Sequence, residues 1–178
     1  MNFTKGEVIA INKPLGMTSF GALAFVRTRI CKRLGVKRIK IGHAGTLDPL
    51  ATGVLVLCTG RLTKRIEEFQ LHGKEYVATL QFGATTPSYD MEHPVNETFP
   101  TDAITRESLE QVLTQFVGDI EQIPPTFSAC KVNGQRAYDL RRNGADVELK
   151  PKHIRIDSIE LMDFSPETMQ ATIRVACG

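Results

Sequence analysis

Several features that would identify common protein classes are missing from this sequence of 178 residues. Its four cysteines lie far apart and form no CxxC pair, which argues against a zinc site or a disulfide framework and indicates a reduced, cytoplasmic protein. No apolar run approaches the length of a membrane span, and the N-terminus lacks the apolar segment of a signal peptide. Neither a Walker A motif nor a GxGxxG motif is present, so the sequence shows no obvious phosphate-binding loop for a nucleotide cofactor. The composition, 42% hydrophobic and 24% charged, is typical of one globular domain with a sizeable core.

Acidic residues are scarce in the first third of the chain. Residues 1–65 hold twelve Lys or Arg but only two acids, Glu7 and Asp48, whereas residues 66–178 hold ten basic and eighteen acidic residues. The segment 27–40 contains seven basic side chains and no acid. Such charges repel one another unless a polyanion neutralises them. We therefore favour a nucleic-acid surface over an ordinary solvated helix face.

Asp48 is the one acid inside this basic region, and it lies in the stretch Gly42-His43-Ala44-Gly45-Thr46-Leu47-Asp48-Pro49-Leu50-Ala51-Thr52-Gly53. Three glycines and a proline predict tight turns and close approach of the backbone to a ligand. Leucines flank the Asp-Pro pair, so we expect the carboxylate to lie at an apolar wall rather than on a wet surface. An Asp-Pro pair is equally well an ordinary turn when taken alone. The surrounding basic charge favours a nucleophile or an acid–base group in a site for a polyanion.

Hydrophobic periodicity predicts an alternation of strands and helices. A strand over 8–11 leads through a Pro/Gly turn to the capping pair Thr18-Ser19 and a helix that reaches Leu34. The apolar run 54–58 predicts a strand buried on both faces, with Asp48 just before it. We further predict a short helix over 63–69, a half-buried strand over 76–82, an irregular segment over 84–101, a helix over 109–117 ended by Gly118, a hairpin turn at Asn133-Gly134, a helical turn over 137–143, and strands near 154–159 and 169–175. No linker divides the chain into two domains.

A second group of basic residues lies between Pro125 and Arg155, with Tyr138 among them: Lys131, Arg136, Arg141, Arg142, Lys150, Lys152 and Arg155. Three acids are interspersed, so the group is weak evidence when taken alone. Its predicted role is a clamp that grips the substrate opposite the first basic region.

The motifs together resemble those of the TruB-type tRNA pseudouridine synthase family. The resemblance is carried by residues 13–19 and 42–53, and by Gly73-Lys74-Glu75-Tyr76, Gly83-Ala84-Thr85-Thr86 with Asp90, and residues 122–141. It implies an α+β fold, a pseudouridine-synthase-like catalytic domain with a mixed, mostly antiparallel sheet flanked by helices and a basic RNA-gripping insertion over 125–152. It also implies isomerisation of the T-loop uridine at tRNA position 55. The implied enzyme is a monomer that uses no cofactor or metal, has the tRNA T-stem-loop as its partner and does not bind a membrane, and the resemblance implies no protein partner.

The same resemblance implies roles for individual residues. Asp48 is the nucleophile that leads to breakage of the N1–C1′ bond, by attack at C1′ or at C6, after which the uracil rotates and is rejoined through C5. Tyr76 stacks on the flipped base and moves a proton at the sugar, and His43 fits into the T-loop where bases are displaced. The other candidate substrate-binding residues are Gly42, Lys13, Lys64, Asp90, Lys131 and Arg141.

One departure from the family concerns the end of the sequence, which stops at Cys177-Gly178 within what resembles the start of the third motif. We therefore expect the catalytic domain over 1–178 to be incomplete, to lack the family's Arg partner of Asp48 and its C-terminal extension, and to form little or no pseudouridine. A non-catalytic tRNA-binding or tRNA-folding fragment is one alternative. A hydrolase of a glycosidic bond is another, and only Asp90 could then supply the second carboxylate.

Overall fold

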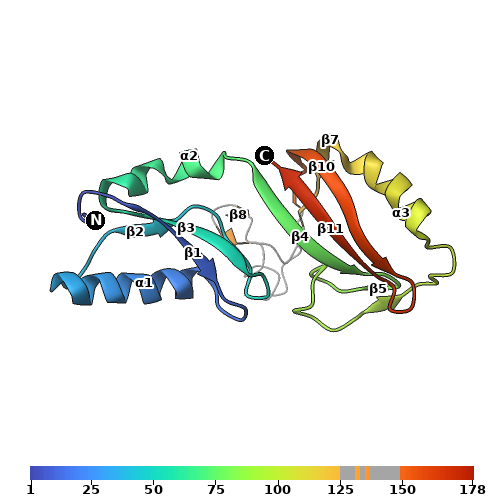
Figure 1. Cartoon of the computed structure of the whole chain (residues 1–178), viewed down its shortest axis with the longest axis horizontal. Coiled ribbons are helices and arrows are strands. Elements are labelled where there is room, and N and C mark those ends of the chain that lie inside the picture. The colour runs from blue at the N-terminus through green and yellow to red at the C-terminus, as the bar shows by residue number, and fades with distance from the viewer. Residues whose placement is uncertain (125–130, 133–134, 137–148) are drawn as a thin grey trace. The chain divides into compact units, whose positions relative to one another are not determined.

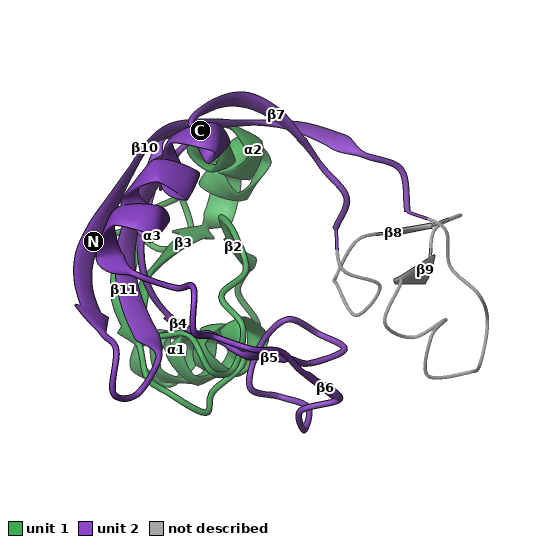
Figure 2. Cartoon of the chain, turned by 90° about the vertical axis from the view of Figure 1, so that its right-hand side faces the viewer, with its two compact units in different colours: residues 1–72 green, residues 73–178 purple. Residues whose placement is uncertain are grey.

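The computed structural model describes residues 1–124, 131–132, 135–136 and 149–178 (Figure 1). These residues form two compact units, Met1–His72 and Gly73–Gly178 (Figure 2). Each unit has its own antiparallel sheet. That residues 1–178 act as one catalytic domain stays a prediction.

Unit 1 is a three-stranded antiparallel sheet with one long helix packed on it (Figure 1). Its strands β1 (Val8–Lys13), β2 (Ile41–His43) and β3 (Gly53–Thr59) are ordered β1-β3-β2. Helix α1 (Ser19–Leu34) forms the core with the central strand, through Ala22, Leu23, Leu55 and Leu57. The 3-10 helix η1 (Gly60–Arg65) and helix α2 (Ile66–Gln70) follow β3.

Both ends of α1 are set by local chemistry. The Thr18 side chain accepts a hydrogen bond from the Gly21 N–H, which satisfies one of the free donors at the helix start. Gly35 ends the helix in the left-handed conformation at φ 65°, where a side chain would be strained. The predicted helix and its cap are confirmed.

The prediction that the strand over 54–58 is buried on both faces is wrong at its start. Leu55 and Leu57 face the core and are at most 2% exposed, whereas Val54 is 71% exposed. Successive side chains of a strand point to opposite faces, and α1 covers only the face that carries Leu55 and Leu57. The continuous apolar run therefore belongs to a central strand whose first residues are buried on one face and exposed on the other.

Unit 2 is built on a four-stranded antiparallel sheet in the order β4-β11-β10-β7. Its strands are β4 (Lys74–Gln81), β7 (Gly118–Gln122), β10 (Lys152–Ser165) and β11 (Gln170–Cys177). Helix α3 (Arg106–Leu113) and the 3-10 helix η2 (Thr114–Phe116) pack against β10. Thr105 and Ser108 form a reciprocal capping box at the start of α3.

Two small strand pairs complete unit 2. Strand β5 (Ala84–Thr85) pairs with β6 (Glu97–Thr98) inside the segment that was predicted to be irregular. Strand β8 (Lys131–Val132) pairs antiparallel with β9 (Gln135–Arg136), as the predicted hairpin requires. Asn133-Gly134 and the predicted helical turn over 137–143 lie outside the described residues.

The predicted α+β class with mostly antiparallel sheets is confirmed, and every strand pairing in the described part of the chain is antiparallel. The strand over 76–82 was predicted to be half-buried. Six of the eight residues of β4 are instead exposed in the described structure, so little covers either face of this strand there. Strands β2 and β7 were not predicted, since three to five residues give too little alternation to recognise.

Candidate active site

The loop that carries Asp48 joins β2 to the central strand β3 in unit 1. Its entrance is fixed by a hydrogen bond from the Ala44 N–H to the Val56 carbonyl, at 2.8 Å. Its exit closes in a turn in which the Ala51 N–H donates to the Asp48 carbonyl, at 3.0 Å. The carboxylate is therefore mounted on a turn whose two ends continue into the sheet.

The residue before Asp48 is held by the first residue of α1. The Ser19 hydroxyl donates to the Leu47 carbonyl and accepts from the Leu47 N–H, both at 2.9 Å. Ser19 is only 3% exposed, and the Leu47 side chain packs against the core. Both backbone polar groups of Leu47 are thus satisfied by one buried side chain. Ser19 was predicted only as part of the capping pair of α1, so this connection was missed.

The residue after Asp48 is held by the segment between β1 and α1. The Pro49 carbonyl accepts hydrogen bonds from the Gly16 N–H at 2.8 Å and from Lys13 Nζ at 3.5 Å. The same ammonium also donates to the Met17 carbonyl at 2.6 Å and to the Pro14 carbonyl at 3.1 Å.

Lys13 has no exposed surface, so its ammonium group donates to these three carbonyls and not to solvent. Lysine is almost never fully buried unless it is paired in this way. This placement disagrees with the predicted role of Lys13 in substrate contact. It gives Lys13 a positioning role behind the Asp48 turn.

The Asp48 side chain itself is exposed, which corrects the expectation of an apolar wall. Of its two leucine neighbours, Leu47 turns into the core and Leu50 is 46% exposed. Successive residues of the turn point in different directions, so the apolar neighbours do not enclose the carboxylate. Its backbone is nevertheless fixed on both sides.

His43 and Gly42 lie at the end of β2, just before this loop. The His43 Nδ1 donates to the Gly45 carbonyl, which leaves Nε2 as the ring nitrogen available to a ligand. A Cβ atom at Gly42 would lie 2.6 Å from Ile66 Cδ1, so glycine allows the close packing of α2 at this point. Lys64 is exposed on η1.

The other predicted site residues belong to unit 2. Tyr76 lies on β4 opposite Val175 of β11 and is 43% exposed. Burial, and then the nearby Cys177 thiol, raise the pKa of the Tyr76 phenol, so this side chain keeps its proton at neutral pH.

Asp90 is engaged in a local turn of unit 2. Its Oδ1 accepts from the Ser88 hydroxyl at 2.6 Å and from the Glu92 N–H at 3.0 Å. These contacts fit a structural role. Lys131 lies on β8, and Arg141 lies outside the described residues.

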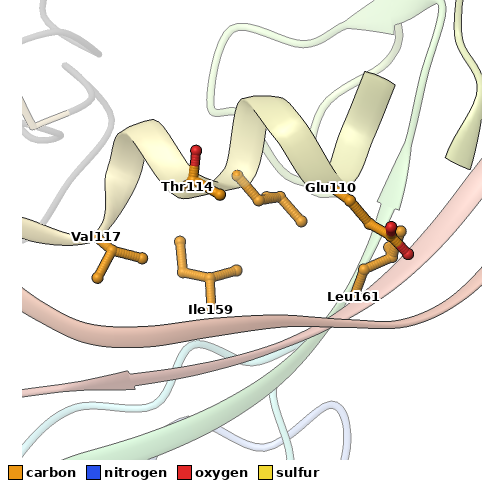
Figure 3. A pocket seen from close by; sticks show the side chains of 6 residues that line it. Glu110, Thr114, Val117, Ile159 and Leu161 are labelled. Atoms are coloured by element: carbon orange, nitrogen blue, oxygen red, sulfur yellow. The ribbon is translucent and has the colours of Figure 1, made fainter. Parts of the chain in front are cut away.

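A pocket in unit 2 lies between α3 and β10 (Figure 3) and contains none of the predicted site residues. Its lining is apolar except for two side chains, and consists of Glu110, Leu113, Thr114, Val117, Ile159 and Leu161. Among the residues that the structure describes, no group of three His, Cys, Asp or Glu could hold a metal ion. In the same residues, no helix is long and apolar enough to cross a membrane.

Comparison with known proteins matches residues 32–178 to the family described as TruB family pseudouridylate synthase (N terminal domain). The tRNA pseudouridine synthase B of Bacteroides thetaiotaomicron is 62% identical over 175 residues, which are 98% of this chain and 73% of the relative. The enzyme of the same name from Thermus thermophilus is 42% identical over 158 residues, which are 89% of this chain and 48% of the relative. A solved Cbf5-Nop10-Gar1 complex contains a similar chain, with a TM-score of 0.65 and 25% identity, and the match covers 98% of this chain and 40% of that one. The chain belongs to the TruB family of pseudouridylate synthases.

Proposed function

We propose that this protein converts uridine to pseudouridine in tRNA, at position 55 of the T-loop, with Asp48 as the nucleophile. The observation that carries the proposal is the Asp48 turn: an exposed carboxylate whose preceding and following residues are both fixed by the segment 13–19. A relative that is 62% identical over 98% of the chain bears the name tRNA pseudouridine synthase B.

The reaction exchanges one glycosidic bond for another within the same nucleotide. The Asp48 carboxylate adds at C1′ or at C6 of the flipped nucleotide, and the N1–C1′ bond breaks, with its electrons remaining on the uracil ring. The ring rotates, C5 bonds to C1′, the carboxylate is released, C5 loses its proton, and N1 gains one. The product is an isomer of the substrate, so no co-reactant is consumed.

Tyr76 and His43 complete the proposed site. The Tyr76 ring presents a partly exposed aromatic face on which a flipped base can stack, and its phenol retains a proton that can be exchanged at the sugar. His43 offers Nε2 toward the RNA because Nδ1 is engaged by the Gly45 carbonyl. Lys13 takes no part in contact with the substrate in this proposal, since its ammonium is buried.

The proposal extends to the substrate and its surroundings. The basic first third of the chain supplies the attraction for the tRNA backbone. We propose that the segment 125–152 acts as a clamp on the RNA, and that the enzyme works as a monomer in the cytoplasm.

The test measures pseudouridine formed per enzyme on a tRNA transcript, both for this chain and for a version lengthened to match the tRNA pseudouridine synthase B of Bacteroides thetaiotaomicron, of which this chain covers 73%. Asp48→Asn is the variant of each. Asn keeps the shape of the side chain but cannot act as the nucleophile, so turnover should be abolished while tRNA affinity stays close to that of the parent. Asp102→Asn is the matched control, because this exposed carboxylate lies in unit 2 and should leave turnover unchanged. Turnover that survives in Asp48→Asn would refute the proposed nucleophile.

The same assay separates the two alternatives. A hydrolase would release free uracil and leave an abasic site in the tRNA. A tRNA-binding or tRNA-folding protein would bind the transcript but form no pseudouridine, even in the lengthened version.

A further inference from the structure

One flank of α1 carries a row of basic and aromatic side chains that the reaction at Asp48 does not use. Phe25, Arg29, Lys32 and Arg33 follow one another at helical spacings of four, three and one residues, so they lie on one side of the helix. All four are exposed, whereas Leu23 and Ile30 on the neighbouring face are buried. Lys37 and Arg38, both exposed, continue the charge beyond the helix end. We call these six residues the α1 basic flank.

Arg29 is held in a defined orientation. Its Cζ lies 3.3 Å from the centroid of the Phe25 ring, and Phe25 is 51% exposed. Stacking on the ring fixes the plane of the guanidinium and leaves its N–H edges free to bind an oxyanion. An orientation held in this way reduces the loss of side-chain entropy when the arginine binds a phosphate.

The α1 basic flank has no acidic partner in the part of the chain that the structure describes. Helix α1 contains no acid, and in the described residues no ion pair involves Arg29, Lys32, Arg33, Lys37 or Arg38. Exposed arginines elsewhere behave differently: Arg65 faces Glu68, and Arg155 faces both Asp119 and Asp157. Within the described residues the five cations of the flank therefore have no carboxylate partner, and a polyanion is the partner that their chemistry fits.

We propose that the α1 basic flank binds the sugar-phosphate backbone of the RNA substrate outside the reacting loop. The proposal rests on the proposed function for its choice of RNA. Ser19 at the start of α1 holds the backbone next to Asp48, and Arg29 follows it by ten residues, or about 15 Å along the helix axis. A uridine at Asp48 therefore cannot itself reach the flank. The contact is with the body of a longer RNA.

The test compares two triple variants of equal net charge. Arg29→Gln, Lys32→Gln and Arg33→Gln remove the centre of the flank, while Arg106→Gln, Gln111→Glu and Gln115→Glu lower the net charge by the same three units on α3 and η2, outside both basic regions of the sequence. Dissociation constants are measured across a range of salt concentrations for a full-length tRNA transcript and for a short T-stem-loop hairpin. Circular dichroism melting verifies that both variants fold.

We expect the flank variant to bind full-length tRNA about tenfold more weakly at low salt, and its log–log salt slope to fall by roughly 2 to 3, since each phosphate contact contributes about one unit. The loss for the short hairpin should be smaller, and the control variant should behave like the parent. Phe25→Leu keeps the apolar bulk but removes the aromatic face, and should weaken tRNA binding by about two- to fivefold.

Two outcomes would overturn the inference. The first is a flank variant with the parent's salt slope, and the second is a control variant that loses as much affinity as the flank variant. If the parent still converts uridine in either case, the proposed function stands without the flank. If the flank variant alone loses affinity but the parent forms no pseudouridine, the surface stands and the proposed function fails.

Discussion

The hydroxyl of Ser19 should control the geometry of Asp48. This side chain is 3% exposed, and its one oxygen satisfies both the N–H and the carbonyl of Leu47, each at 2.9 Å. Ser19→Ala leaves a backbone donor and a backbone acceptor without their partner. An unsatisfied group of this kind costs about 1–3 kcal/mol, and alanine recovers a few tenths of a kcal/mol through its helix propensity. We expect the free energy of unfolding to fall by roughly 2–4 kcal/mol.

The effect on catalysis follows from the position of Leu47, directly before the proposed nucleophile. If the loop relaxes by about 1 Å, a loss of around 100-fold in kcat is expected, because attack requires an aligned carboxylate. Affinity for tRNA should change little, since Ser19 is buried and contacts no ligand surface. The assay is pseudouridine formation at saturating tRNA, together with urea unfolding followed by circular dichroism.

Two comparisons isolate the hydroxyl from the general effect of substitution. Ser19→Thr and Ser19→Val introduce the same bulk, but only threonine retains the hydroxyl. The kcat of Ser19→Thr should therefore be higher than that of Ser19→Val. Thr28→Ala removes another hydroxyl of α1, which donates to the Ala24 carbonyl at an exposed position, and should leave turnover unchanged. Equal kcat values for Ser19→Thr and Ser19→Val would refute the reasoning.

Three further predictions follow from other contacts. Lys13→Met removes the donor to the carbonyls of Pro14 and Met17, and should lower the free energy of urea unfolding by roughly 2–4 kcal/mol; an unchanged value would contradict the role of the buried ammonium. Thr105→Ala breaks the capping box of α3 and should cost about 1 kcal/mol in thermal unfolding. The fold raises the pKa of the Tyr76 phenol. The stability that the protonated phenol contributes is therefore present below the ordinary phenol pKa of about 10 and is lost as the pH rises above that value. Tyr76→Phe should reduce the fall in the free energy of unfolding at alkaline pH. In turnover assays Tyr76→Phe should retain tRNA binding and lose activity, whereas Tyr76→Leu should lose both.

The parts of the fold that follow from local chemistry could be predicted from the sequence. The cap at Thr18, the periodic apolar residues of α1 and the apolar run of β3 each determine their element within a short window. The very short strands could not be predicted, because they exist only through pairing with distant partners such as β3 and β10.

The support of the candidate site was harder to predict for a related reason. Ser19 and Leu47 are 28 residues apart, and no local pattern indicates that they are hydrogen-bonded. Lys13 was assigned to the substrate through the family resemblance of residues 13–19, whereas its burial depends on three carbonyls that converge only in the folded chain. Asp48 was identified by charge context and motif, but its exposure depends on how the turn directs each side chain.

Helix α1 serves two separable purposes in this scheme. Its first residue holds the Asp48 turn through buried hydrogen bonds, so changes there should act on kcat. Its exposed flank begins at Phe25 and carries charges without acidic partners in the described residues, so changes there should act on affinity and its salt dependence. A single rigid helix therefore links the position of the nucleophile to the surface proposed for the RNA body. An RNA seated on the flank is then held at a fixed distance from the carboxylate, which is the pre-organisation that attack on a flipped nucleotide requires.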